Sequence, residues 1–196
     1  MSKTRWAIFA MLILASCGGA YKPPPRNLDN ACSISKQRPN YIKAFEATER
    51  KWGVPVHVQM AIIHQESKFR ADARTPFRYV LGVIPMGRQS SAYGYSQALD
   101  ATWDEYRKAT GRRGAKRDRI TDASDFMGWY MNESLRRNNI ALDDARNQYL
   151  AYHEGNAGYA RGSYRKKSWL VRVAANVDAR AQMYGSQLAT CGKRRS

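Results

Sequence analysis

The feature that most constrains the fold is a helical repeat of apolar residues in six segments between residue 40 and about residue 185. Apolar side chains three or four positions apart lie on one face of a helix, and that face needs a partner surface to cover it. The segments are 40–52, a stretch after Pro55 with Val56, Met60 and Ile63, a stretch with Leu99, Trp103 and Tyr106, 121–138, 141–153 and about 168–185. About 160 residues follow the leader and linker described below, an ordinary size for one domain. The pattern therefore predicts a mainly α, single-domain protein.

A long irregular stretch interrupts the helical pattern. Residues 74–91 read RTPFRYVLGVIPMGRQSS, with two prolines, two glycines and the β-prone run FRYVLGVI. Such a long loop inside a compact domain is usually functional. We therefore expect a long loop with a short β-hairpin, lying beside a cleft.

The first sixteen residues have the layout of a secretory signal peptide. Lys3 and Arg5 precede the apolar run 6–15, which is too short to span a bilayer, since about 20 residues are needed. The run ends LASC, which resembles the bacterial lipobox, whose cysteine becomes the lipidated first residue of the mature protein. We expect a signal peptide over 1–16 and lipidation of Cys17. An ordinary signal peptide that leaves Cys17 free is the alternative.

The residues after Cys17 indicate a tether and a location. Gly18 follows the cysteine, and by resemblance to Gram-negative lipoproteins this favours a periplasmic protein anchored to the outer membrane. Gly-Gly and a triple proline cannot build a core, so we interpret 17–39 as the lipidated cysteine and a flexible linker. The folded domain is expected over 40–191.

Cysteine usage supports export. If Cys17 carries lipid, Cys32 and Cys191 remain as a pair that brackets nearly the whole domain. A disulfide between them would form and persist in an oxidising compartment. Two unrelated buried thiols are the alternative.

The chain is strongly basic, with a formal net charge of +17 and dense basic runs at 107–119 and 161–172. For an exported protein, this charge favours anionic envelope polymers and lipid head groups as partners over nucleic acid. A solvated basic face that aids solubility is the alternative for either run. We expect a monomer that binds no nucleic acid.

Glu66 lies one helical turn after Ile62 and Ile63, in the sequence HQESKFRADA. Apolar neighbours raise the pKa of a carboxyl because they desolvate its charged form. A carboxylic acid still protonated near neutral pH can protonate a leaving oxygen, as glycosidic cleavage requires. On position alone, an ordinary helix-end glutamate facing water is the favoured interpretation.

Two further stretches change this balance: SAYGYSQALDATW at 91–103 and LAYHEGNAGY at 150–159. With ESKFRADA at 66–73, they resemble in order and spacing the three motifs of the lysozyme-like lytic transglycosylases of the SLT type. Those motifs are Glu-Ser, a Gly-x-x-Gln turn before a helix with Thr-Trp, and Ala-Tyr-Asn before a Gly-rich turn. The resemblance covers about 40–185. It implies an α+β lysozyme-like domain, mainly helical, that cleaves peptidoglycan glycan strands.

The resemblance also implies roles for single residues. Glu66 would be the sole catalytic acid/base, and the substrate-binding residues would be Ser91, Gly94, Tyr95, Gln97, Tyr152 and His153. Gly94 permits a tight turn at the cleft wall. Gln97 offers a donor and an acceptor to an acetamido group, and the Tyr152 hydroxyl is expected to point at the catalytic carboxyl.

Some positions in these motifs carry open alternatives or depart from the family. Tyr93 and Tyr95 are expected to stack on sugar rings, with half-buried packing as the alternative. His153 stands where asparagine is usual, and Tyr95-Ser96 stand where Leu-Met is usual. The pocket contacts of this chain are therefore expected to differ in detail from those of the family.

The mechanism depends on a missing residue. Glycosidases usually need two carboxylates beside the bond, and the second motif offers no acid ahead of its turn. The resemblance supplies another nucleophile, the carbon-6 hydroxyl of the same N-acetylmuramic acid, which closes a 1,6-anhydro ring. Two alternatives stay open: a hydrolytic muramidase of the goose-lysozyme kind with Asp72 or Glu154 as second acid, and a non-catalytic basic lipoprotein that binds the envelope.

The histidines give no metal signature. His57, His64 and His153 have no known ligand spacing. His64 and Glu66 have the His-x-Glu spacing of zinc deaminases, but the Pro-Cys-x-x-Cys partner is absent. We expect neither a metal nor another cofactor.

Overall fold

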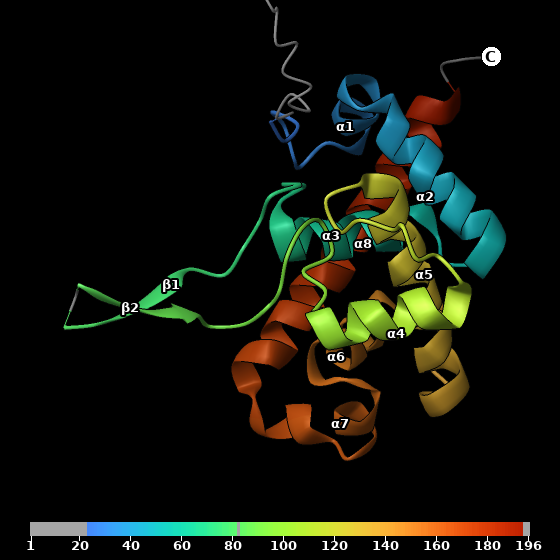
Figure 1. Cartoon of the computed structure of the whole chain (residues 1–196). Helices are drawn as coiled ribbons and strands as arrows, with labels where there is room; N and C mark the ends of the chain where they lie inside the picture. The colour runs from blue at the N-terminus through green and yellow to red at the C-terminus, as the bar shows by residue number, and fades with distance from the viewer. Residues whose placement is uncertain (1–22, 82, 194–196) are drawn as a thin grey trace, which may run out of the picture.

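The computed structural model describes residues 23–81 and 83–193 (Figure 1). The described residues form eight α-helices, one short 3-10 helix and a two-stranded sheet. In chain order these are α1 (Ala31–Gln37), α2 (Pro39–Trp52), α3 (Val56–Ser67), β1 (Phe77–Val80), β2 (Ile84–Arg88), α4 (Asp100–Thr110), α5 (Ile120–Asn138), α6 (Ala145–Glu154), α7 (Asn156–Ala160), η1 (Ser163–Lys166) and α8 (Ser168–Lys193). The predicted mainly α, single-domain, lysozyme-like class is confirmed.

Helix α3 is the buried centre of the domain. Every residue from Val58 to His64 is at most 6% exposed, because α2, α6 and α8 all pack against this helix. A helix that is apolar nearly all round is expected to be buried in this way. The sequence predicted a single stripe on α3, whereas the structure buries almost its whole circumference.

Helices α2 and α5 cross at short range. A Cβ atom at Gly128 would lie 2.5 Å from the Trp52 ring and 2.6 Å from the Thr48 methyl group, so only glycine fits there. Buried polar groups tie α5 to both α2 and α3: the Ser124 hydroxyl lies 2.7 Å from the Thr48 hydroxyl and donates to the Gln59 side-chain oxygen at 2.7 Å. Burying these polar groups costs little, because each has a hydrogen-bond partner.

An aromatic cluster joins α4 to α5. Trp103 lies 5.2 Å, between ring centroids, from both Tyr106 and Phe126. Leu99, which the sequence placed on the same buried face, is instead 47% exposed at the position that caps α4. Its backbone is extended there, which turns its side chain away from the stripe.

The predicted hairpin is present. Strands β1 and β2 pair antiparallel, with Phe77 opposite Arg88 and Val80 opposite Ile84. The hairpin projects from one side of the helical body (Figure 1). Leu81, at its tip, is 86% exposed.

The boundary between linker and domain was predicted too late in the chain. Residues 31–37, assigned to the flexible linker 17–39, form α1, which packs against α8 and α2. Ala31 and Ile34 are fully buried, and the Asn30 side chain caps the helix by accepting a hydrogen bond from the Ser33 amide. Two apolar residues and a good cap sufficed to start a helix directly after the proline-rich stretch.

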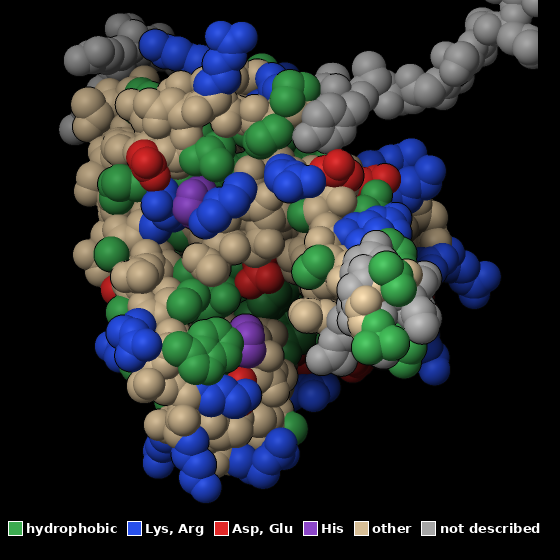
Figure 2. All heavy atoms as spheres, turned by 90° about the vertical axis from the view of Figure 1, so that its left-hand side faces the viewer, with side chains coloured by type: hydrophobic (Ala, Val, Ile, Leu, Met, Phe, Trp, Pro, Cys, Tyr) green, Lys and Arg blue, Asp and Glu red, His purple; other side chains and the backbone are tan. Residues whose placement is uncertain are grey.

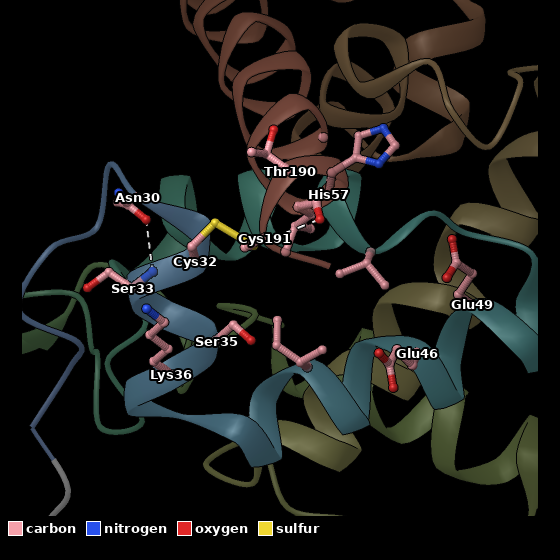
Figure 3. Close-up of a pocket in the computed structure, with 14 residues that line it drawn as sticks. Asn30, Cys32, Ser33, Ser35, Lys36, Glu46, Glu49, His57, Thr190 and Cys191 are labelled. Carbon is pink, nitrogen blue, oxygen red and sulfur yellow. Dashed lines mark hydrogen bonds between the residues drawn. A yellow bond between two sulfur atoms is a disulfide. The ribbon is translucent and has the colours of Figure 1, made fainter. Parts of the chain in front are cut away.

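The predicted disulfide is present between Cys32 in α1 and Cys191 in α8, with their Cα atoms 5.9 Å apart (Figure 3). Helix α8 extends to Lys193, eight residues past its predicted end, and so reaches the partner cysteine. The bridge joins positions 159 residues apart.

Part of the basic run 107–119 is structural. Arg112 forms ion pairs with the buried carboxylates of Asp122 (2.7 Å) and Asp125 (3.1 Å). Arg117 donates to the Ala98 carbonyl oxygen at 2.8 Å and pairs with Asp100 at 2.6 Å. These two arginines fasten the loop after α4 to the body.

No helix in the described residues is long and apolar enough to cross a membrane.

Candidate active site

Glu66 is the penultimate residue of α3, and the chain turns sharply after it. Lys68 and Phe69 both adopt left-handed backbone conformations, with φ of 53° and 60°. The Lys68 amide closes the helix by donating to the His64 carbonyl oxygen at 3.1 Å, while the Phe69 ring is fully buried. The buried ring anchors this unfavourable turn, which leaves the Glu66 carboxyl at the edge of the core, partly exposed.

The surroundings of Glu66 favour its protonated form. Burial is the largest influence and raises the pKa of Glu66 to about 7, although a hydrogen bond with Tyr149 and the positive charge of Lys68 both act to lower it. In the described part of the chain, no ion pair involves Glu66. About half of the Glu66 carboxyls are therefore protonated at neutral pH, so the group can both donate and accept a proton.

The tyrosine whose hydroxyl acts on the pKa of Glu66 through hydrogen bonding is Tyr149, not Tyr152. Both tyrosines lie on α6. The Tyr152 hydroxyl was expected to point at Glu66, but it donates to the Ser96 carbonyl oxygen at 2.5 Å. Burial raises the pKa of Tyr152, and the negative charge of nearby Glu66 raises it further. Tyr152 thus fastens the second motif beside the carboxyl.

The second motif is a tight turn packed against the loop after α4. Gly94 has φ of +78°, and a Cβ atom there would lie 2.2 Å from the Arg117 carbonyl oxygen. That oxygen accepts a hydrogen bond from the Tyr95 amide at 3.2 Å. Gly94 therefore permits both the backbone conformation and the close contact, and it holds the turn in place next to α6.

The two tyrosines of this motif do not form an open sugar-stacking surface. Tyr95 is 5% exposed, and its hydroxyl lies 2.9 Å from that of Tyr41 in the core, which corrects its assignment as a substrate-binding residue. Tyr93 is partly buried, and the guanidinium of Arg74 lies over its ring at 4.2 Å. Packing accounts for both rings.

Gln97 and Ser91 are largely engaged by the protein itself. The Gln97 side-chain amide donates to the Ala73 carbonyl oxygen (2.9 Å) and the Gly94 carbonyl oxygen (2.8 Å). Both amide hydrogens are therefore used, and Gln97 has only its carbonyl oxygen to offer an acetamido group. The Ser91 hydroxyl accepts from the Asp100 amide at 3.1 Å and so supports the start of α4.

The other acids near the motifs are committed elsewhere. Glu154 is 4% exposed and accepts hydrogen bonds from Lys167 (2.7 Å) and Ser163. Burial acts to raise the pKa of Glu154, but these hydrogen bonds, with a third from His153, outweigh it and bring the pKa to about 2. Asp72 is half exposed and lies 3.5 Å from Arg70.

Sequence reasoning missed two residues close to the site. No role in the site was predicted for Tyr149, although its position three residues before Tyr152 places both on one side of α6. Trp169 was not considered. It is 49% exposed, and its ring centroid lies 5.3 Å from that of His153, itself an exposed residue. The signal available in the sequence was a tryptophan at the start of the expected helix 168–185.

The face that carries the hairpin is hollowed. Figure 2 shows this hollow in the middle of the face, with an acidic side chain at its edge. A cavity of about 850 Å³ lies elsewhere, between α1, α2, the start of α3 and the end of α8, and none of the three motifs lines it (Figure 3). Within residues 23–81 and 83–193, no group of three or more potential ligand side chains is placed to hold a metal ion.

The site thus combines a lysozyme-like helical domain, a protonatable glutamate and a turn that Tyr152 holds beside it, an arrangement chemically suited to general acid/base work. Comparison with known families agrees: the family model described as "Transglycosylase SLT domain" matches residues 5–191. The chain belongs to this family, whose members degrade peptidoglycan as lyases. No curated protein matches the sequence significantly.

Proposed function

We propose that this protein is a lytic transglycosylase that cleaves the β-1,4 bond from N-acetylmuramic acid to N-acetylglucosamine, with Glu66 as its only acid/base. The observation that carries the proposal is a carboxyl without an ion-pair partner among the described residues, with a pKa of about 7, at the penultimate position of the buried helix α3. A carboxyl with this pKa is suited to both halves of a proton-transfer cycle near neutral pH.

The reaction has two steps. Glu66 protonates the bridge oxygen while the bond from that oxygen to carbon 1 of muramic acid breaks, and the acetamido oxygen of the substrate stabilises the cation. The ionised Glu66 then removes the proton from the carbon-6 hydroxyl as its oxygen bonds to carbon 1. Glu66 regains its proton, and no water is consumed. An intramolecular nucleophile gains effective concentration over bulk water.

The state of the neighbouring acids favours ring closure over hydrolysis. A hydrolytic mechanism with inversion needs a second carboxylate to activate water. Glu154 is held by Lys167 and Ser163, and Asp72 is half exposed beside Arg70. Neither is a free base facing Glu66.

Product analysis tests the proposal. Purified protein is incubated with peptidoglycan, and the soluble products are analysed by mass spectrometry, with Glu66→Gln as the inactive control. We expect muramic acid in its anhydro form, one water lighter than the reducing sugar. Products with a reducing muramic acid would support the muramidase alternative, and lysis by Glu66→Gln equal to that of the parent would support the non-catalytic one.

We also propose that the protein is exported and anchored to the outer membrane through lipidated Cys17, which lies outside the described residues. The disulfide supports an oxidising compartment. Metabolic labelling with palmitate tests the anchor: the parent should incorporate label and fractionate with outer membranes, and Cys17→Ala should do neither. Equal labelling of the two proteins would contradict it.

A further inference from the structure

An exposed aromatic pair lies at the start of α8. Trp169 is 49% exposed, and it meets His153 at the end of α6 edge to face, with 5.3 Å between ring centroids and 78° between ring planes. A tryptophan this exposed leaves a large apolar surface in water, which a ligand can cover. The first turn of α8 packs on the core through Leu170, which is fully buried, so the Trp169 ring is not required for core packing.

The pair is continuous with the catalytic carboxyl. The His153 ring lies 6.4 Å, between centroids, from Tyr149, and the Tyr149 hydroxyl is near enough to Glu66 to lower the pKa of its carboxyl. Positions 149 and 153 are one turn apart on α6 and therefore share a face. A row of side chains thus runs from Glu66 through Tyr149 and His153 to Trp169. Figure 2 shows histidine and hydrophobic side chains bordering the hollow on this face.

The far end of the row is held rigidly. His153 Nδ1 lies 3.1 Å from Glu154 Oε1, and the same oxygen accepts from Lys167 Nζ at 2.7 Å. Glu154 therefore links the end of α6 to the residue two positions before Trp169. Because both rings are placed before any ligand arrives, a ligand that stacks on them loses little free energy to ordering side chains.

We propose that Trp169 and His153 form a platform that binds a pyranose ring of the glycan strand, beyond the sugar whose bond Glu66 cleaves. The inference rests on the proposed function for the identity of the strand. The apolar C–H face of an N-acetylated hexosamine matches a flat aromatic surface, and its hydroxyl groups remain in water at the edge. The Trp169 ring supplies the flat face of the platform, and the His153 imidazole, at 78° to it, supports that ring edge to face.

Binding without turnover is the first test. In the Glu66→Gln background, calorimetry measures the Kd for a soluble oligomer of β-1,4-linked N-acetylglucosamine. We expect Trp169→Ala to raise this Kd about tenfold and Trp169→Phe, which keeps a ring, to raise it about threefold or less. Leu81→Ala, which removes an exposed apolar side chain at the hairpin tip, is the matched control and should leave the Kd unchanged.

Kinetics provide the second test, because a stacking surface and a structural role affect different constants. In the active enzyme, Trp169→Ala should raise KM for peptidoglycan about tenfold with kcat within about twofold, the pattern of a lost contact that binds ground state and transition state equally. An unchanged Kd and KM in Trp169→Ala would overturn the platform, as would equal weakening by Leu81→Ala. If the parent binds the oligomer through Trp169 but does not cleave peptidoglycan, the proposed function fails while the platform stands.

Discussion

At the scale of single residues, the chemistry of this protein depends on how few polar contacts Glu66 makes. The Tyr149 hydroxyl and the Lys68 ammonium both favour the charged form of its carboxyl, but burial outweighs both. The resulting pKa of about 7 fits a group that must give up a proton and then recover it.

The pH dependence of activity follows from this pKa. In the proposed mechanism only the protonated form of Glu66 can begin the reaction, so kcat/KM should fall as pH rises through about 7, to roughly a tenth of its plateau one unit higher. Turbidity clearing of peptidoglycan between pH 5 and pH 9, at constant ionic strength, measures it. A flat profile across this range would contradict the assigned role.

Replacing Glu66 by glutamine should lower the activity and raise the stability of the fold above neutral pH. Glu66→Gln should lower the lytic rate by at least about 100-fold. Because the folded-state pKa lies above the unfolded value, ionisation of Glu66 destabilises the fold progressively as pH rises from about 4.5 to about 7. Glutamine avoids this loss, so the variant should be more stable than the parent by on the order of 2 kcal/mol at pH 8 and nearly equal to it at pH 4. Urea unfolding at the two pH values compares them; an equal difference at both would be inconsistent with the raised pKa.

Tyr149 should tune this titration. Its hydrogen bond stabilises the ionised carboxylate, so Tyr149→Phe should move the alkaline limb of the activity profile to higher pH by about one unit. Tyr152→Phe is the matched control, because that hydroxyl donates to the Ser96 carbonyl oxygen, and its limb should stay in place. A shift in the control with none in Tyr149→Phe would reverse the two assignments.

At the scale of elements, the site is made where three segments meet: the end of α3, the turn at Gly94 and the middle of α6. The turn is held from one side by Arg117 and from the other by Tyr152. Neither contact comes from the sequence neighbours of the turn, so its geometry depends on the tertiary structure.

Gly94→Ala tests how closely this turn is fitted. The new Cβ atom would meet the Arg117 carbonyl oxygen at 2.2 Å and would require a left-handed backbone, so the free energy of unfolding should fall by about 3 kcal/mol. Gly111→Ala is the matched control: its φ of +72° is similar, but nothing lies within 4 Å of the added atom, so the cost should be about 1 kcal/mol. Chemical unfolding measures both. Equal losses would show that backbone conformation alone matters.

Local signals in the sequence predicted most elements but fewer contacts. Periodicity placed α2, α5 and α8, and turn residues placed the hairpin. Helix α1 was missed because seven residues beside a proline-rich stretch carry too short a repeat to recognise. Tyr95 was misassigned for a different reason: an aromatic residue with a polar tip suits a core or a cleft equally well, and only its contact with Tyr41 of α2 decides.

At the scale of the whole molecule, one covalent bond joins the two ends of the described domain. Removing it with paired Cys32→Ser and Cys191→Ser changes should lower the free energy of unfolding by up to about 5 kcal/mol, because the bridge closes a loop of nearly the whole domain. Urea unfolding of the leaderless protein measures the loss. The pH profile of activity should not change, since the bridge is remote from Glu66, and a loss below about 1 kcal/mol would contradict the entropic argument.

The disulfide also has a mechanical consequence. Tension applied to the N-terminal segment reaches Cys32 and passes through the bridge into α8, which runs about 33 Å from Cys191 to Trp169. This covalent path does not pass through the turn after Glu66. In the proposed lipid-anchored enzyme, force between the anchor and a glycan strand bound at Trp169 would be transmitted along a single helix.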